Sequence, residues 1–176
     1  MNKRYLGAVA SLLLTILIMI VIFMLSAQDS SESSSLSDLI ARMLAGVLIF
    51  DFHDLSADEQ MRIIEQWSWP IRKTAHASEY ACLAISLVVT CWQIAAWRHE
   101  TREGARLCPR RIPFVGMTAF AIAVLYACSD EIHQLFIDGR AGQVADVLVD
   151  ASGAAIGCLL MCLLMWRFMA RRMRRC

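Results

Sequence analysis

Four long hydrophobic runs, separated by polar connections, dominate the pattern of this chain. They cover about residues 6–27, 74–97, 112–134 and 146–168. Each run is longer than the roughly 20 apolar residues that an α-helix needs to cross the hydrocarbon core of a bilayer. The pattern therefore predicts an all-α fold, an integral membrane four-helix bundle in which residues 1–176 form a single domain.

The connection between the first two spans, residues 28–73, carries signals for short outer amphipathic helices. A capping box that begins at Ser35 precedes apolar residues at helical spacing. A second capping box begins at Ser56, and we expect Pro70 to end the helix that follows it. The apolar stripe of the first helix either lies in the membrane interface or packs on the bundle. This stripe consists of Leu36, Leu39, Ile40, Met43, Leu44, Val47 and Leu48.

Basic residues are concentrated on one side of the predicted bundle. Of 17 Lys and Arg residues, twelve lie before the first span, between the second and third, or after the fourth. Because basic flanking segments stay in the cytoplasm, both termini are expected inside and residues 28–73 outside. A hydrophobic content of 58% and a mean hydropathy of +0.52 agree with a multi-pass protein of the cell membrane. The basic middle loop lacks aromatic residues, so nucleic acid is not an expected partner.

Ionisable residues gather where three of the predicted spans reach the outer surface. At about 1.5 Å per residue, Lys73 lies roughly 36 Å from Trp97, at the level of the outer headgroups. The same count brings Asp130 and Asp146 to a similar level from the inner ends of their own spans. Since ionisable groups are costly in a bilayer and usually mark function there, we expect one polar site at this depth. Its candidate members are Lys73, His76, Glu79, Asp130, Glu131, His133, Gln134 and Asp146.

Helical spacing predicts that the fourth span turns its carboxylates inward. Asp146, Asp150, Gly153 and Gly157 are separated by four, three and four residues and so share one face. The two glycines form a small-x-x-x-small pattern, which lets another helix approach closely. In the short turn before this span, Arg140 would hang over the carboxylates and could hold one of them, or a phosphate, with two hydrogen bonds.

These residues resemble the VanZ-like family of small membrane proteins, whose namesake is associated with resistance to the glycopeptide teicoplanin. The resemblance rests on residues 73–80, 129–134, 139–140, 146 and 153–157, and it covers about residues 5–168. It implies a site formed by Lys73, His76, Glu79, Asp130, Glu131, Gln134, Arg140 and Asp146. The chain has Asp138 where the family commonly has Pro. It also has Asp150 where the family commonly has Asn, so the resemblance assigns Asp150 no role.

The first functional hypothesis is a site that binds or modifies a cell-envelope lipid or glycan precursor at the outer leaflet. Glycopeptide resistance is then the expected phenotype. In an enzymatic version, His76 with Glu79 or Asp130 would act as general acid and base. Whether the protein is an enzyme is left open by the sequence. A metal-dependent version would place a divalent ion among His76, Glu79, Asp130, His133 and Asp146.

The alternative is a non-catalytic membrane scaffold or partner protein, whose charges only neutralise one another and fix helix packing. Lys73 would then pair with Glu79 or Asp146, and Arg140 with Asp130. A transporter is disfavoured because the inner halves of the spans are nearly uncharged, whereas an ion pathway needs polar groups at depth. The expected partners are the lipid bilayer and a lipid-linked envelope precursor or a glycopeptide; the sequence leaves the oligomeric state open.

Overall fold

The described chain is almost entirely helical, and four of its helices are long and apolar enough to cross a membrane. The computed structural model describes residues 3–28, 30–103, 108–137 and 142–173. Its elements are α1 (Lys3–Ser26), α2 (Ser30–Leu48), η1 (Phe52–Asp54), α3 (Ala57–Glu103), η2 (Pro109–Arg111), α4 (Ile112–Gln134) and α5 (Val144–Met173). The predicted all-α fold with four membrane spans is confirmed by α1, α3, α4 and α5.

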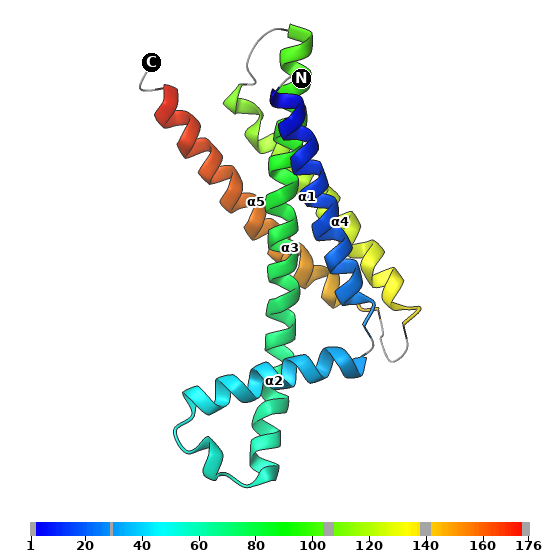
Figure 1. Cartoon of the computed structure of the whole chain (residues 1–176), viewed down its shortest axis with the longest axis vertical. Coiled ribbons are helices and arrows are strands. Elements are labelled where there is room, and N and C mark those ends of the chain that lie inside the picture. Colours follow the sequence, from blue (N-terminus) through cyan, green and yellow to red (C-terminus); the bar gives the residue numbers. More distant parts are fainter. Residues whose placement is uncertain (1–2, 29, 104–107, 138–141, 174–176) are drawn as a thin grey trace.

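Helix α3 forms the centre of the molecule and contacts α1, α2, α4 and α5. Its 47 residues extend over about 70 Å, more than twice the roughly 30 Å of a hydrocarbon core. The first part of α3 therefore projects beyond the bundle, and α2 lies across this projecting part (Figure 1). The start of α1 and the end of α5 lie at one end of the bundle, whereas the end of α4 and the start of α5 lie at the other.

The backbones of α3 and α5 touch at two glycines, as the small-x-x-x-small pattern predicts. A methyl group built on Gly153 would lie 1.9 Å from the carbonyl oxygen of Ala77. One built on Gly157 would lie 2.3 Å from the carbonyl oxygen of Ala81. Only glycine permits this approach, which turns the face of α5 that carries Asp146 and Asp150 toward α3.

A seam of polar contacts joins α1 to α3 along the other half of the bundle. The hydroxyl groups of Thr15 and Thr90 share a buried hydrogen bond of 2.9 Å. Nearer the chain termini, Nε of Arg4 lies 2.5 Å from a carboxylate oxygen of Glu100. These contacts fix the register of α1 on α3, and with it the position of Ser26 at the far end of α1.

Pro70 does not end a helix, contrary to the sequence-based prediction, and α3 runs through it without a break. Proline lacks an N–H group, so the helix loses one hydrogen bond there. The Ser68 hydroxyl donates to the carboxylate of Asp38 in α2 at 2.5 Å, and Arg72 donates to a hydroxyl of α2 at 3.0 Å. Because these contacts lie on either side of Pro70, packing against α2 holds both turns in helical register.

Helix α2 begins at Ser30, five residues before the predicted capping box at Ser35. The predicted start at Ser35 is therefore wrong, and Asp38 of that predicted box accepts a hydrogen bond from Ser68 of α3. The second predicted capping box is confirmed at the start of α3. There the Ser56 N–H donates to the Glu59 carboxylate at 3.0 Å, and the Glu59 N–H donates to the Ser56 hydroxyl at 3.4 Å.

Candidate functional site

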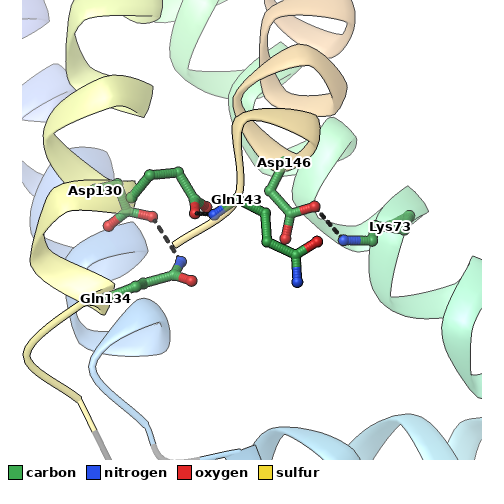
Figure 2. Close-up of polar contacts among 6 residues, drawn as sticks. Lys73, Asp130, Gln134, Gln143 and Asp146 are labelled. Carbon is green, nitrogen blue, oxygen red and sulfur yellow. Dashed lines mark hydrogen bonds and ion pairs between the residues drawn. The ribbon is translucent and has the colours of Figure 1, made fainter. Parts of the chain in front are cut away.

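The middle part of α3, the end of α4 and the start of α5 bring carboxylates from three helices together at the end of the bundle opposite the chain termini. Figure 2 shows Asp130 of α4, Asp146 of α5 and Lys73 of α3. We call the set Glu79, Asp130, Glu131, Asp146 and Asp150 the acidic cluster, and this end of the bundle the cluster end. At its edge, the Lys73 ammonium donates to the Asp146 carboxylate, and both side chains are mostly buried. This ion pair between α3 and α5 is one of the two pairings that the sequence predicts for Lys73.

Asp130 and Gln134 lie one turn apart on α4 and connect the acidic cluster to α1. The Gln134 amide donates to the Ser26 hydroxyl at 3.1 Å, and it lies 3.4 Å from a carboxylate oxygen of Asp130. Asp130 is 3% exposed and Gln134 is 4% exposed. Both side chains therefore lie on the buried face of α4.

Glu131 holds the backbone that leads into α5. Its carboxylate accepts the N–H of Gln143 at 2.8 Å (Figure 2). A methyl group built on Gly142 would lie 2.6 Å from the carbonyl oxygen of Glu131, so this segment lies directly against the end of α4. Helical spacing places Glu131 about 100° from Asp130. Both are nevertheless buried, because the segment before α5 covers the side of α4 that Glu131 occupies.

Asp150 lies at the centre of the acidic cluster and is completely buried. Neither of its carboxylate oxygens has a hydrogen-bond partner among the described residues, and the same is true of the buried Tyr80 hydroxyl. The other four carboxylates of the cluster are near enough for their charges to act on Asp150. An unsatisfied buried carboxylate is among the costliest groups that a fold can hold. This position therefore carries a large electrostatic cost that packing alone does not require.

Glu79 faces a groove between α3 and α1, and its charge lies within range of Asp130. The groove measures about 320 Å³ and has almost entirely apolar walls. It is lined by Leu17, Ile18, Val21 and Ile22 of α1 and by Ser78, Glu79 and Cys82 of α3. Glu79 thus links the acidic cluster to an apolar groove on the side of the bundle.

The two histidines of the predicted site occupy its periphery. His76 is half-buried on α3, one turn from Lys73. The ring of His133 stacks on Phe23 of α1 with centroids 4.4 Å apart, which turns it toward α1. Among the described residues, no group of three His, Cys, Asp or Glu side chains is arranged to hold a metal ion. The described side chains are therefore not arranged as the metal site that the metal-dependent hypothesis requires.

Arg140, and with it Asp138 and Gly139, lies outside the described residues. Its predicted role above the carboxylates stays a prediction.

Four residues of this site were not among its predicted members: Asp150, Tyr80, Ser26 and Gln143. The signal for Asp150 was present, since it shares a helical face with Asp146 and Gly153, but the family resemblance gave it no role. Tyr80 lies one helical turn from His76, and this spacing groups it with Lys73 and His76 on one face of α3. Ser26 and Gln143 contribute through contacts between elements that are distant in the sequence, and no pattern within either segment indicates them.

Comparison with known proteins gives one match. A family model described as VanZ/LLP1 matches residues 11–165, which include every described residue of the site. No curated protein and no solved structure matches the chain.

Proposed function

The chain belongs to the VanZ-like family, and from this premise we propose that its acidic cluster binds the polar head of a cell-envelope lipid or lipid-linked glycan precursor. The observation that carries the proposal is the completely buried Asp150, whose oxygens have no hydrogen-bond partner among the described residues. Buried polar groups are normally satisfied, and exceptions call for an explanation. A ligand that displaces the side chains covering Asp150 and donates hydrogen bonds to its carboxylate supplies one.

The balance of charge indicates what kind of ligand head the cluster would accept. The described site holds five carboxylates against Lys73, and Arg140 would add one further positive charge. Ionised carboxylates only accept hydrogen bonds, so the complementary groups are hydroxyls, amides and amines. Sugars and amino sugars of an envelope precursor offer such donors. A phosphate would have to lie at the edge, near Lys73.

The groove between α1 and α3 supports a ligand that is partly lipid. Its walls are apolar, it opens on the side of the bundle, and Glu79 belongs both to the groove and to the acidic cluster. An acyl or polyprenyl chain could lie along α1 while its polar head reaches the carboxylates. In this arrangement the ligand would enter from the bilayer, so the site needs no opening to water.

We further propose that this binding contributes to tolerance of a glycopeptide antibiotic such as teicoplanin. Such an antibiotic acts on envelope precursors, so a protein that holds or alters a precursor would change its effect. A chemical step is a separate matter. It would use His76 with Glu79 or Asp130 as acid and base, and it predicts turnover of the precursor that is lost in His76→Ala.

Binding can be measured with the purified full-length protein in lipid nanodiscs and a lipid-linked glycan precursor of the cell wall as the probe. Asp130→Asn should weaken binding at least tenfold, because it removes one acceptor charge without changing side-chain size. Asp58→Asn is the matched control: it makes the same change on an exposed residue of the projecting part of α3. Equal affinity of wild type and Asp130→Asn would overturn the proposal, as would absence of binding by the wild type.

The second candidate is a non-catalytic scaffold, and the Lys73–Asp146 ion pair favours it because this pair joins α3 to α5. If the charges only hold the helices together, breaking such a pair should cost up to about 3–5 kcal/mol, less where water screens it. The loss would appear first as less folded protein in the membrane. Normal abundance of Asp130→Asn with lost binding favours the site, whereas lost abundance with normal affinity per folded molecule favours the scaffold.

A further inference from the structure

Helix α2 contacts α3 through one narrow face made of small residues. Ala41 and Ala45 are completely buried there. Asp38 accepts the hydroxyl hydrogen bond of Ser68, which marks the point where the two helices cross. Helix α2 lies across α3 rather than along the bundle (Figure 1).

The large apolar residues of α2 do not take part in this contact. Met43 is 65% exposed and Val47 is 83% exposed. They belong to the apolar face of α2, which consists of Leu36, Leu39, Ile40, Met43, Leu44 and Val47, all of them exposed. A continuous apolar face of this size on a helix marks an interaction surface.

A different edge of α2 faces η1. A methyl group built on Gly46 would lie 3.3 Å from Nε2 of His53, so Gly46 lies against this imidazole. Ile49, just after α2, packs with Phe52 and Ile64. Element η1 and the start of α3 lie on the far side of α2 from the bundle (Figure 1). Successive helical residues are rotated by about 100°, so the centre of the apolar face lies about a quarter turn from this edge and points away from the contact with α3. Arg42 follows Ala41 in the sequence, and its side chain is exposed on the polar side of α2.

The depth of the crossing matches a membrane surface. Ser68 lies 29 residues from Trp97 on α3, about 44 Å along the helix axis. A bilayer with its headgroups is roughly 40–45 Å thick, so α2 would lie at its outer edge if Trp97 marks the opposite interface. A helix with side chains has a radius of about 5–6 Å, so side chains on the bundle side of α2 reach most of the way to Lys73, which lies about 7.5 Å from Ser68 along α3.

Interface anchors occur at the same level. Trp69 is exposed, and the Lys73 ammonium lies 5.8 Å from the centre of its ring. Tryptophan and lysine are both enriched where spanning helices meet the headgroups. The surface of α3 next to α2 therefore has the composition of a membrane interface.

We propose that α2 is an interfacial helix whose apolar face inserts into the headgroup–acyl boundary of the leaflet at the cluster end. Interfacial helices bury their apolar face by about 5–10 Å, which is the reach estimated for α2. The arrangement holds the bundle at a fixed depth, because α2 rests on the membrane while α3 passes through it. This inference does not depend on what the acidic cluster binds.

Single cysteines in a variant without the seven native cysteines can test the position of α2. A fluorescent label at Met43→Cys is compared with the same label at Arg42→Cys, its neighbour on the polar side. The protein is placed in vesicles of phosphatidylethanolamine and phosphatidylglycerol. Quenching is measured with a lipid that carries a spin label near its headgroup and, separately, with iodide in the buffer.

The label at position 43 should be quenched at least twofold more by the lipid than by iodide, and the label at position 42 should show the reverse order. Stronger quenching by iodide at position 43 would place the face in water and overturn the proposal. Protection from both quenchers would also overturn it, because protein would then cover the face. A photo-crosslinking amino acid at Met43 provides a second measurement with the native cysteines in place, and it should attach to lipid rather than to a second copy.

Discussion

At the scale of single residues, the site is defined by acceptors that lack donors. Asp146 has Lys73 and Glu131 has the backbone of Gln143, whereas Asp150 is buried among other carboxylates. Each further carboxylate raises the cost of keeping Asp150 charged, because like charges repel more strongly away from water. A fold under selection for stability alone would remove this group, and an uncharged amide of the same size would serve.

Asp150→Asn should therefore raise the free energy of unfolding, by about 1–3 kcal/mol, because it replaces a buried carboxyl group without a described hydrogen-bond partner by an amide of the same size that never carries a charge. If the carboxylate serves the ligand, affinity for the precursor should fall at the same time. Unfolding in detergent titrations measures the first effect and nanodisc binding the second. Ser152→Ala, at an exposed position on the same helix, is the control and should change neither quantity. A less stable Asp150→Asn would show that the carboxylate holds a native contact.

At the scale of helices, the position of the cluster depends on how closely α5 approaches α3. This approach is set by glycines rather than by the charges, since backbone atoms of Ala77 and Ala81 occupy the space where methyl groups would be. Small residues are the usual means of close helix association in membranes, where lipid tails compete equally for apolar surfaces. The charges then lie at a junction that exists without them.

Gly153→Ala tests whether the glycines determine how closely α5 approaches α3. Its methyl group would lie 1.9 Å from a backbone oxygen, so the helices must move apart. Overpacking of this kind typically costs about 1–3 kcal/mol, and contact with backbone, which yields little, places the expected loss at the upper end. Ile156→Ala, on the exposed face of α5, is the control and should leave the melting temperature nearly unchanged. Equal melting temperatures for wild type and Gly153→Ala would contradict the close contact.

Local patterns were enough to predict the elements whose boundaries depend on the chain itself. The third span was expected at 112–134, and α4 occupies those residues. The capping box at Ser56 forms as its residue types predict, and the shared face of Asp146 and Gly153 points inward. In each case the determining contacts are formed within one helix or by a fixed helical spacing.

Predictions were wrong where a contact distant in the sequence decides the outcome. Pro70 was expected to end a helix, and α2 holds the helix together on both sides of it. The start of α2 was expected at Ser35, five residues too late, and Asp38 of the expected capping box accepts a hydrogen bond from Ser68 of α3. Asp150 was assigned no role because the family commonly has Asn at this position, although helical spacing already placed it on the face of Asp146. Sequence spacing predicts which face of a helix carries a side chain, but it does not predict which residue of another helix that side chain contacts.

At the scale of the whole molecule, the chain is strongly asymmetric along the bundle axis. The cluster end carries the carboxylates, α2 and the projecting part of α3, whereas the start of α1 and the end of α5 lie at the other end (Figure 1). Most basic residues of the sequence flank that other end. Charge segregation of this kind orients a protein during insertion, because basic flanks resist transfer across the membrane.

The orientation can be tested at the two ends of α3, where Asp58 and Arg102 are both exposed. We expect Asp58→Cys, in a variant without other cysteines, to react with a membrane-impermeant maleimide on intact cells. Arg102→Cys should react only after the membrane is permeabilised, because it lies among the basic residues that are expected in the cytoplasm. Both positions are exposed on the helix, so a difference in labelling reports the side of the membrane rather than burial. Labelling of Arg102→Cys on intact cells would reverse the orientation and would move the acidic cluster to the inner leaflet. The proposed binding of an outer-leaflet precursor would then fail, while the interfacial position of α2 would be unaffected.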